Sequence, residues 1–275
     1  MPAIDPLGRS PADWRRAALI AIGLLTLWRI LCLAFTPLQL DYEEAQYWFW
    51  AQEPAWGYFS KPPLIAWLIR LSTALFGDGE FGIRLPSPVM HGIAALVAGA
   101  AAARLADARA GFWTAIAYAT LPGVAFSALL MTTDVPLLLA WSLALYGFVR
   151  MAGEGGSTGW AIWTGLAVGL GALAKYAMAF FLPGVALALL CLPGLARRVG
   201  VARLAIMVGV ALLVFLPNLL WNLDQGWITV RHTGLPAVEA SLSQRLGKIG
   251  AFLGGQVAIA GPILLVAMLG GLGAG

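Results

Sequence analysis

The side chains best suited to chemistry in this sequence lie in one short stretch, residues 40–64. It contains three closely spaced carboxylates, Asp41, Glu43 and Glu44, together with eight aromatic residues and Lys61. A positioned carboxylate can take a proton from a hydroxyl group, and a lysine ammonium can neutralise a phosphate. These residue types predict either a solvated surface loop or a water-facing reaction site for an anionic substrate.

The composition identifies the chain as a membrane protein. Its 275 residues are 60% hydrophobic and 11% charged, with a mean hydropathy of +0.83, whereas soluble domains carry about 25% charged residues. A net charge of +4 without a Lys/Arg run argues against nucleic-acid binding. No His, Cys and carboxylate spacing is typical of a zinc site. No cofactor is predicted, and the requirement for a divalent metal is left open.

Apolar segments long enough to approach the roughly 20 residues that a bilayer-crossing helix needs recur along the chain. They predict an all-α polytopic membrane protein, a single transmembrane domain over residues 1–275 with about eight spans and a long outer loop at 36–85. The run after Arg15 and Arg16 continues for about one membrane thickness, which favours a retained first span over a cleaved signal peptide. The predicted spans are 17–35, 86–105, 111–130, 134–151, 159–175, 177–194, 202–221 and 249–272.

The segment 64–76 is too short to span comfortably and contains Arg70. It is predicted to lie in the membrane interface; the alternative is a ninth span, which would reverse every later loop. With 64–76 in the interface, the predicted cytoplasmic segments hold nine basic and four acidic residues, and the outer segments hold seven basic and nine acidic residues. The net charge is then +5 on the cytoplasmic side and −2 on the outer side, and this asymmetry favours the interfacial position of 64–76. Arg29, inside the first span, is long enough to reach the outer rim.

This topology places ionisable residues from five connections or helix ends on one outer face, which favours a shared site. The residues are Asp41, Glu43, Glu44, Lys61, Asp134, Lys175, Arg231 and His232. Cys32 and Cys191 fall near opposite faces, so no disulfide is predicted.

Each candidate also has a purely structural interpretation. Asp41 and Glu44 have the spacing of a capping box at a helix start, which leaves Glu43 unexplained and makes it the candidate general base. Asp134, at the mouth of a span, also reads as a helix N-cap. Lys61, held by two following prolines, and Lys175 are either interfacial anchors or ligands of a lipid phosphate.

The order of motifs resembles a known family of membrane enzymes. E-E-A-Q-Y-W at 43–48, G-Y-F-S-K-P-P at 57–63, T-T-D-V-P-L at 132–137, G-L-G-A-L-A-K-Y at 169–176 and P-N-L-L-W-N at 217–222 resemble bacterial glycosyltransferases of the ArnT and protein O-mannosyltransferase type. The resemblance covers about residues 15–235 and implies a GT-C-like helix bundle with interfacial helices in the first outer loop.

The resemblance also implies a function. Such enzymes transfer a sugar from a polyprenyl-phosphate donor to a lipid, glycan or protein acceptor at the outer face of the cytoplasmic membrane, which is the inner membrane of the cell. It implies catalytic roles for Glu43, Glu44, Asp134 and Asp41, and contacts with the donor phosphate for Lys61, Lys175 and Arg231. Membrane lipids are the other expected partners.

Three features depart from the family pattern. Glu43 stands where the family usually has Asp, and Ser60 stands where ArnT-like members have an acid. Relatives usually carry more transmembrane helices and often a soluble domain, so the resemblance implies a chain truncated relative to them. Two other functions remain open from the sequence: a transporter or flippase of lipid-linked substrates, and a non-catalytic membrane assembly protein. Transporters usually bind substrate near the bilayer midplane.

Overall fold

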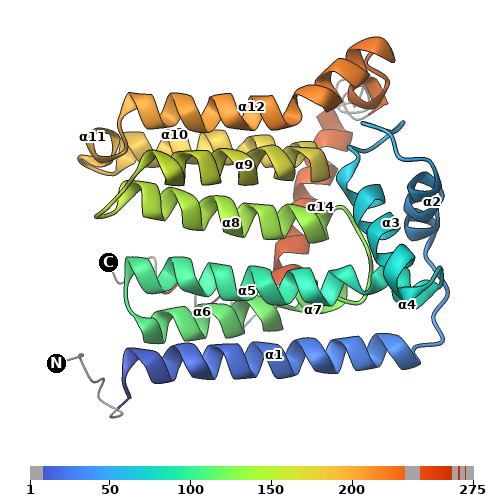
Figure 1. The fold of residues 1–275 in the computed structure, drawn as a ribbon, viewed down its shortest axis with the longest axis horizontal. Helices are drawn as coiled ribbons and strands as arrows, with labels where there is room; N and C mark the ends of the chain where they lie inside the picture. The colour runs from blue at the N-terminus through green and yellow to red at the C-terminus, as the bar shows by residue number, and fades with distance from the viewer. Residues whose placement is uncertain (1–8, 233–241, 262–265, 267–269, 271–275) are drawn as a thin grey trace.

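The protein is a bundle of long helices with a helical cap at one end (Figure 1). The computed structural model describes residues 9–232, 242–261, 266 and 270. In chain order the helices are α1 (Pro11–Phe35), α2 (Tyr42–Gln52), α3 (Leu64–Phe76), α4 (Glu80–Arg84), α5 (Pro86–Leu105), α6 (Ala108–Thr120), α7 (Pro122–Ser127), α8 (Asp134–Ala152), α9 (Thr158–Ala174), the 3₁₀ helix η1 (Tyr176–Phe180), α10 (Phe181–Cys191), α11 (Leu195–Val199), α12 (Val201–Asp224) and α14 (Leu242–Ala260).

Most predicted spans are helices at the predicted positions, which confirms the all-α fold class. The segment 86–105 is α5, 134–151 lies in α8 and 202–221 in α12. The segment 159–175 coincides with α9 except for its last residue, Lys175, which is the C-cap. Within the described residues, four helices are long and apolar enough to cross a membrane: Pro11–Phe35, Glu80–Leu105, Asp134–Ala152 and Val201–Asp224. Thr158–Ala174 and Tyr176–Cys191 are shorter apolar helices. The chain is thus a multi-pass membrane protein.

The predicted span 111–130 is broken into α6 and α7 at Leu121. Pro122 starts α7 and has no N–H to donate to the preceding turn. Arg29 of α1 donates from Nη2 to the carbonyl oxygen of Ala119 in that turn, at 2.6 Å, and is only 7% exposed. The expectation that Arg29 reaches the outer rim is therefore wrong, because its guanidinium is held inside the bundle at the break.

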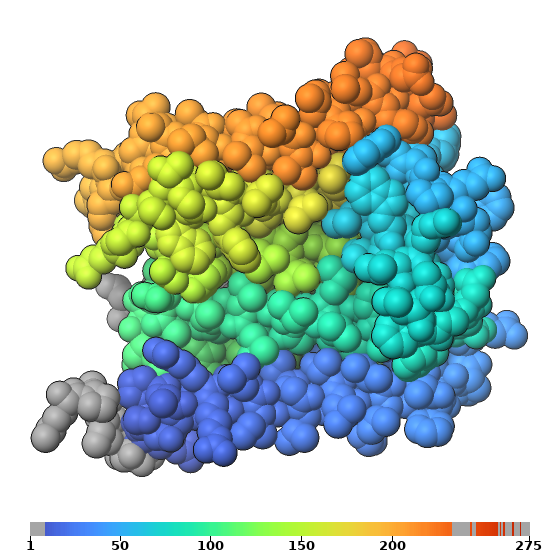
Figure 2. All heavy atoms as spheres, in the orientation of Figure 1, coloured from blue at the N-terminus to red at the C-terminus, as the bar shows by residue number. Residues whose placement is uncertain are grey.

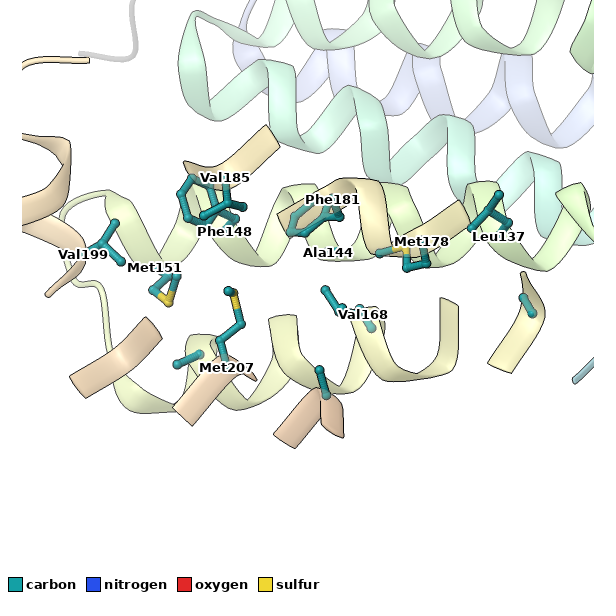
Figure 3. Packing of buried hydrophobic residues seen from close by; sticks show 14 of the residues in the cluster. Leu137, Ala144, Phe148, Met151, Val168, Met178, Phe181, Val185, Val199 and Met207 are labelled. Atoms are coloured by element: carbon teal, nitrogen blue, oxygen red, sulfur yellow. The ribbon is translucent and has the colours of Figure 1, made fainter. Parts of the chain in front are cut away.

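Small residues bring the long helices close together. A Cβ atom at Gly165 of α9 would overlap the carbonyl oxygen of Met207, and one at Gly169 would overlap Val214, both in α12. The two glycines form a G-x-x-x-G pair, a spacing that allows close packing of membrane helices. Figure 3 shows Phe148, Phe181 and Met178 in the neighbouring core between α8, α9, η1 and α10.

The long predicted outer loop covers one end of the bundle, which we call the capped end. Figure 1 shows α2, α3 and α4 gathered there, with α3 running across the ends of the long helices. In Figure 2 these residues, blue to cyan, lie beside the end of α12 in orange. The helix predicted to lie in the interface over 64–76 is α3, with the same bounds.

The last predicted span, 249–272, agrees less well with the structure than the spans at α5, α8 and α12 do. The helix α14 begins at Leu242 and is not among the described helices that are long and apolar enough to cross a membrane. Residues 262–265, 267–269 and 271–275 lie outside the described part of the chain. Cys32 and Cys191 are both free.

Candidate functional site

A buried ion pair fixes the start of α2 at the capped end. Glu44 is 1% exposed and Arg84 is 2% exposed, and they form two hydrogen bonds, Nε–Oε1 at 2.9 Å and Nη2–Oε2 at 2.6 Å. Arg84 also donates to the carbonyl oxygens of Leu38 and Gln39. Glu44 accepts from the backbone N–H of Met131 at 2.9 Å. The pair therefore joins the chain before α2, the end of α4 and the loop before α8.

The predicted capping box at the start of α2 is confirmed. The Asp41 side chain accepts from the backbone N–H of Glu43, and the Asp41 backbone N–H donates to Glu44 Oε2 at 3.1 Å. Glu44 thus has its oxygens committed to the cap, to Arg84 and to Met131. Its role in the fold is to position the first turn of α2.

Glu43, by contrast, points to an accessible part of the capped end. Its side chain is 45% exposed, and its Oε1 lies 3.8 Å from Nζ of Lys61, which is 26% exposed. The hydroxyl of Tyr47, one helical turn further along α2, donates to Glu43 Oε2 at 2.9 Å. One carboxylate oxygen is therefore held by a neutral donor, and the other faces a cation.

A second partly exposed ion pair lies where the start of α8 meets the end of α9. Nζ of Lys175 lies 2.8 Å from Oδ1 and 3.0 Å from Oδ2 of Asp134, and both side chains are partly exposed. Reading Asp134 as an N-cap is wrong: the N-cap of α8 is Thr133, and Asp134 is the first helical residue. Its carboxylate is directed to Lys175 because α8 and α9 are packed neighbours.

The environment of Tyr47 links the two ion pairs. Tyr47 is fully buried, and burial, its hydrogen bond to Glu43 and the negative charges of Glu43 and Asp134 all raise its pKa above the ordinary tyrosine value. The hydroxyl contacts Glu43 directly and also senses the charge of Asp134. Tyr47 keeps its proton and acts as a hydrogen-bond donor to Glu43.

The loop carrying Lys61 is docked onto the end of α12. Asn218 is fully buried and donates from Nδ2 to the carbonyl oxygen of Trp56 at 2.6 Å. A Cβ atom at Gly57 would overlap the ring of Trp221, so only glycine allows this approach. Thr229 donates to the carbonyl oxygen of Tyr58 at 2.7 Å.

Asn218 also reaches the segment that follows Lys175. The hydroxyl of Tyr176 donates to Asn218 Oδ1 at 3.1 Å, and Tyr176 directly follows Lys175 in the chain. The single side chain of Asn218 therefore fixes both the Trp56–Lys61 loop and the Lys175–Tyr176 junction. The P-N-L-L-W-N motif thus has a structural role at the capped end.

Six of the seven predicted site residues take part in the cap of α2 or in one of the three ion pairs at the capped end. Arg231 is exposed, and the described structure gives its side chain no ion pair with the others. His232 packs against Phe59, with ring centroids 4.6 Å apart. The described residues include no group of three or more His, Cys, Asp or Glu side chains placed to hold a metal ion.

Sequence reasoning missed Arg84, Tyr47 and Asn218. An arginine directly before a span is costly to bury without a carboxylate partner, which could have drawn attention to Arg84. Tyr47 lies four residues after Glu43, the spacing of side chains on one helix face. Asn218 has no comparable local signal, because its partner Trp56 is 162 residues away.

The curated relatives that the chain matches are named as sugar transferases. The chain is 43% identical over 256 residues to "Lipid A galacturonosyltransferase RgtD" of Rhizobium johnstonii, covering 93% of this chain and 53% of the relative. It is 35% identical over 172 residues to the "Undecaprenyl phosphate-alpha-4-amino-4-deoxy-L-arabinose arabinosyl transferase" of Pseudomonas paraeruginosa, covering 58% of this chain and 30% of the relative. The chain thus spans about half or less of these curated relatives.

Solved structures share the fold. ArnT from Cupriavidus metallidurans in the apo state aligns with a TM-score of 0.65 at 24% identity, over 78% of this chain and 43% of that chain. The Pmt1-Pmt2 protein O-mannosyltransferase complex of S. cerevisiae aligns with a TM-score of 0.63 at 18% identity, over 77% of this chain and 34% of that chain. The predicted GT-C-like helix bundle is confirmed.

The family comparison agrees with both results. Residues 60–221 match the family described as "Dolichyl-phosphate-mannose-protein mannosyltransferase", a range that includes Lys61, Arg84, Asp134, Lys175 and Asn218. The resemblance drawn from the sequence motifs is therefore confirmed, and the chain belongs to the dolichyl-phosphate-mannose-protein mannosyltransferase family.

Proposed function

We propose that this protein is an inverting glycosyltransferase that moves a sugar from a polyprenyl-phosphate donor to an acceptor hydroxyl at the outer face of the inner membrane. The observation that carries the proposal is the pairing of Glu43 with Lys61, at 3.8 Å, in an accessible part of the capped end. A candidate base and a candidate phosphate ligand thus lie within reach of one substrate.

The names of the relatives support this class of donor and acceptor. One relative is named for a galacturonosyl transfer to lipid A, another for an undecaprenyl-phosphate-linked arabinose. A solved ArnT structure with the same fold is described as bound to undecaprenyl phosphate. We extend these names to a polyprenyl-phosphate sugar as donor and a lipid as acceptor for the present chain.

Lys61 is assigned to the donor phosphate. Its ion pair with Glu43 is long and both side chains are partly exposed, and such pairs contribute little stability. A phosphate can therefore take the place of the carboxylate as the partner of Lys61. As the bond between sugar C1 and the phosphate oxygen breaks, negative charge grows on the phosphate, and the ammonium stabilises the transition state more than the bound substrate.

Glu43 is assigned as the general base. When Lys61 turns to the phosphate, Glu43 Oε1 becomes available, while Oε2 stays bonded to Tyr47. The acceptor oxygen attacks C1 from the face opposite the phosphate, its proton passes to Glu43, and the polyprenyl phosphate leaves. We assign Asp134 and Lys175 to orienting the acceptor and to secondary contact with the phosphate. Asp41 and Glu44 hold the turn of α2 that carries the base.

The charge distribution supports an outer location for the site. The end of the bundle opposite the cap carries Arg104, Arg150, Arg197, Arg198 and Arg203 near its helix ends, as cytoplasmic segments usually do. The capped end would then face outward, where the donor sugar and a lipid acceptor are both accessible.

The proposal is tested by sugar transfer in membranes supplied with a panel of labelled polyprenyl-phosphate sugars. Glu43→Gln removes the base and keeps the shape, so we expect transfer to fall by about 100-fold or more while donor binding persists. Lys61→Ala should instead weaken donor binding. Glu53→Gln changes an exposed carboxylate at the end of α2 and is the matched control. Full activity of Glu43→Gln would exclude Glu43 as the base.

A further inference from the structure

A pocket lies between α1, α5 and α6 at the end of the bundle opposite the cap, where Figure 1 shows the start of α1, the end of α5 and the start of α6. Its volume is about 520 Å³. The lining runs from Leu96 to Arg104 along α5 and from Ala108 to Ala115 along α6, which is about 12 Å and about 10 Å at 1.5 Å per residue. The pocket therefore extends from the rim of the bundle into the depth of a hydrocarbon core, which is about 30 Å thick.

Two arginines line this pocket on its rim side. Arg15 of α1 and Arg104 of α5 are both exposed, and within the described residues neither guanidinium forms an ion pair or a hydrogen bond. None of the described lining residues is Asp or Glu. A guanidinium presents five N–H donors in a planar arrangement that suits a phosphate. The rim of the pocket therefore has the chemistry of an anion site.

The acidic residues that neighbour these arginines in the sequence are already used as helix caps. The Asp13 carboxylate accepts from the backbone N–H and the hydroxyl of Ser10, at 2.8 and 2.7 Å. The Asp107 side chain accepts from the backbone N–H of Ala110 at 2.7 Å. Because both carboxylates hold the starts of their helices, the positive charge at the pocket is left for an anion that is not part of the described chain.

The deeper walls of the pocket are apolar and open to the side. Leu19, within the membrane-spanning α1, is 59% exposed and lines the pocket, and Ala100 of α5 is also exposed. Leu96 and Phe112 complete the apolar wall. A free phosphate would leave this surface uncovered. A phospholipid supplies an anionic headgroup and, directly below it, an apolar chain, which is the order in which the pocket changes from arginines to leucines.

We infer that this pocket binds an anionic phospholipid, with Arg15 and Arg104 donating to its headgroup and an acyl chain against Leu19 and Leu96. The inference goes beyond the proposed function and uses it only to name the leaflet. With the capped end outside, the pocket belongs to the cytoplasmic leaflet, and basic pockets between membrane helices on that side suit anionic headgroups. The bound lipid joins α1 to α5 and α6.

Binding of lipids to the purified full chain in detergent, followed by native mass spectrometry, tests the inference. Phosphatidylglycerol, phosphatidylethanolamine and diacylglycerol with the same acyl chains are three probes, and glycerol 3-phosphate supplies the phosphate without chains. We expect phosphatidylglycerol to bind most tightly. Arg15→Gln and Arg104→Gln should each weaken it about fivefold, the contribution of one basic residue near a membrane surface. Arg197→Gln removes an exposed arginine of α11 that does not line the pocket and should leave the affinity unchanged.

A matched pair on α1 tests the apolar wall without changing any charge. Leu19→Trp adds bulk inside the pocket, whereas Ile20→Trp adds it at the next residue, which is exposed and does not line the pocket. Only Leu19→Trp should weaken phosphatidylglycerol.

Three results would overturn the inference. Glycerol 3-phosphate that binds as tightly as phosphatidylglycerol would show that no lipid chain is recognised. An equal effect of Arg197→Gln and the two pocket variants would show that only the overall charge matters. Loss of phosphatidylglycerol in Lys61→Ala alone would place this lipid at the capped end. Sugar transfer enters none of these measurements, so failure of the proposed function would leave them unaffected.

Discussion

Two neighbouring glutamates at the start of α2 have different environments. Glu44 is 1% exposed and bonded to Arg84, Met131 and the Asp41 backbone, whereas the side chain of Glu43 is 45% exposed and faces Lys61. Consecutive residues of an α-helix point about 100° apart, since 3.6 residues make a turn. One carboxylate can therefore be used for structure while its neighbour is left for chemistry.

Tyr47 offers a prediction at the residue scale. Its pKa is raised in the folded protein, chiefly by burial, above the ordinary value of 10.0. The unfolded chain therefore loses this proton at a lower pH than the folded protein does. The stability linked to Tyr47 is fully present below about pH 10 and is lost as the pH rises further.

We expect the apparent melting temperature in detergent, followed by circular dichroism, to fall above pH 10, and to fall less steeply in Tyr47→Phe. Tyr42→Phe, at an exposed tyrosine of the same helix, is the control and should keep the wild-type slope. Identical slopes for wild type and Tyr47→Phe would contradict the interpretation of Tyr47 as a buried neutral donor.

At the scale of helices and loops, the capped end depends on two connections between distant elements. The Glu44–Arg84 pair joins α2 to the end of α4, and Asn218 joins α12 to the loop that carries Lys61. Both are buried, so they fix positions more firmly than the exposed ion pairs do. Each connection can be removed by a single substitution.

Arg84→Ala leaves the Glu44 carboxylate buried without its cation. Removing one partner of a buried pair typically costs about 3–5 kcal/mol, so we expect a large fall in the apparent melting temperature. Arg84→Lys should recover little of the lost melting temperature, because lysine cannot form the bidentate hydrogen bonds that arginine makes with a carboxylate. Glu80→Gln, at an exposed position of α4, is the control. A near-wild-type melting temperature for Arg84→Ala would show that the pair is not needed.

Gly57→Ala tests the contact between the Lys61 loop and α12. The added Cβ would overlap the Trp221 ring and Asn218 Nδ2, and overpacking of this kind costs about 1–3 kcal/mol. We expect weaker binding of the polyprenyl-phosphate donor, because the displaced loop carries Lys61. Gly209→Ala in α12 meets nothing within 4 Å and should leave donor binding unchanged. Equal donor affinity in both variants would mean that the loop position does not control Lys61.

At the scale of the whole molecule, the bundle separates two kinds of charge. The carboxylates and lysines of the candidate site lie at the capped end, while arginines dominate the connections at the other end. This separation matches the asymmetry that orients membrane proteins. We therefore expect the capped end to face outward and the arginine-rich end to face the cytoplasm.

Cysteine labelling checks the orientation. In a background with Cys32 and Cys191 replaced by Ala, an impermeant maleimide applied from the periplasmic side should label Lys61→Cys and Asp134→Cys but not Arg198→Cys. Labelling of positions 61 and 134 from opposite sides of the membrane would rule out a shared site. Arg198 is exposed in α11, so its failure to react would reflect its side of the membrane and not burial.

The sequence by itself determined the helices, the cap of α2 and the family. The spans of α5, α8, α9 and α12, the interfacial α3 and the Asp41–Glu44 capping box follow from apolar length and from contacts three or four residues apart, which local sequence records. It also indicated a shared site, although Arg231 forms no ion pair with the other described residues of that site and Asp134 is not a cap.

Only the tertiary structure decided which charges pair and what holds them. Arg84 reaches Glu44 across 40 residues, and Asn218 reaches Trp56 across 162. The hydrogen bonds that join Asn218, Asn222 and Tyr176 are likewise a product of packing between η1 and α12. The physical reason is that hydropathy and capping act over a few residues, whereas the partner of a buried polar group is set by which helices pack together.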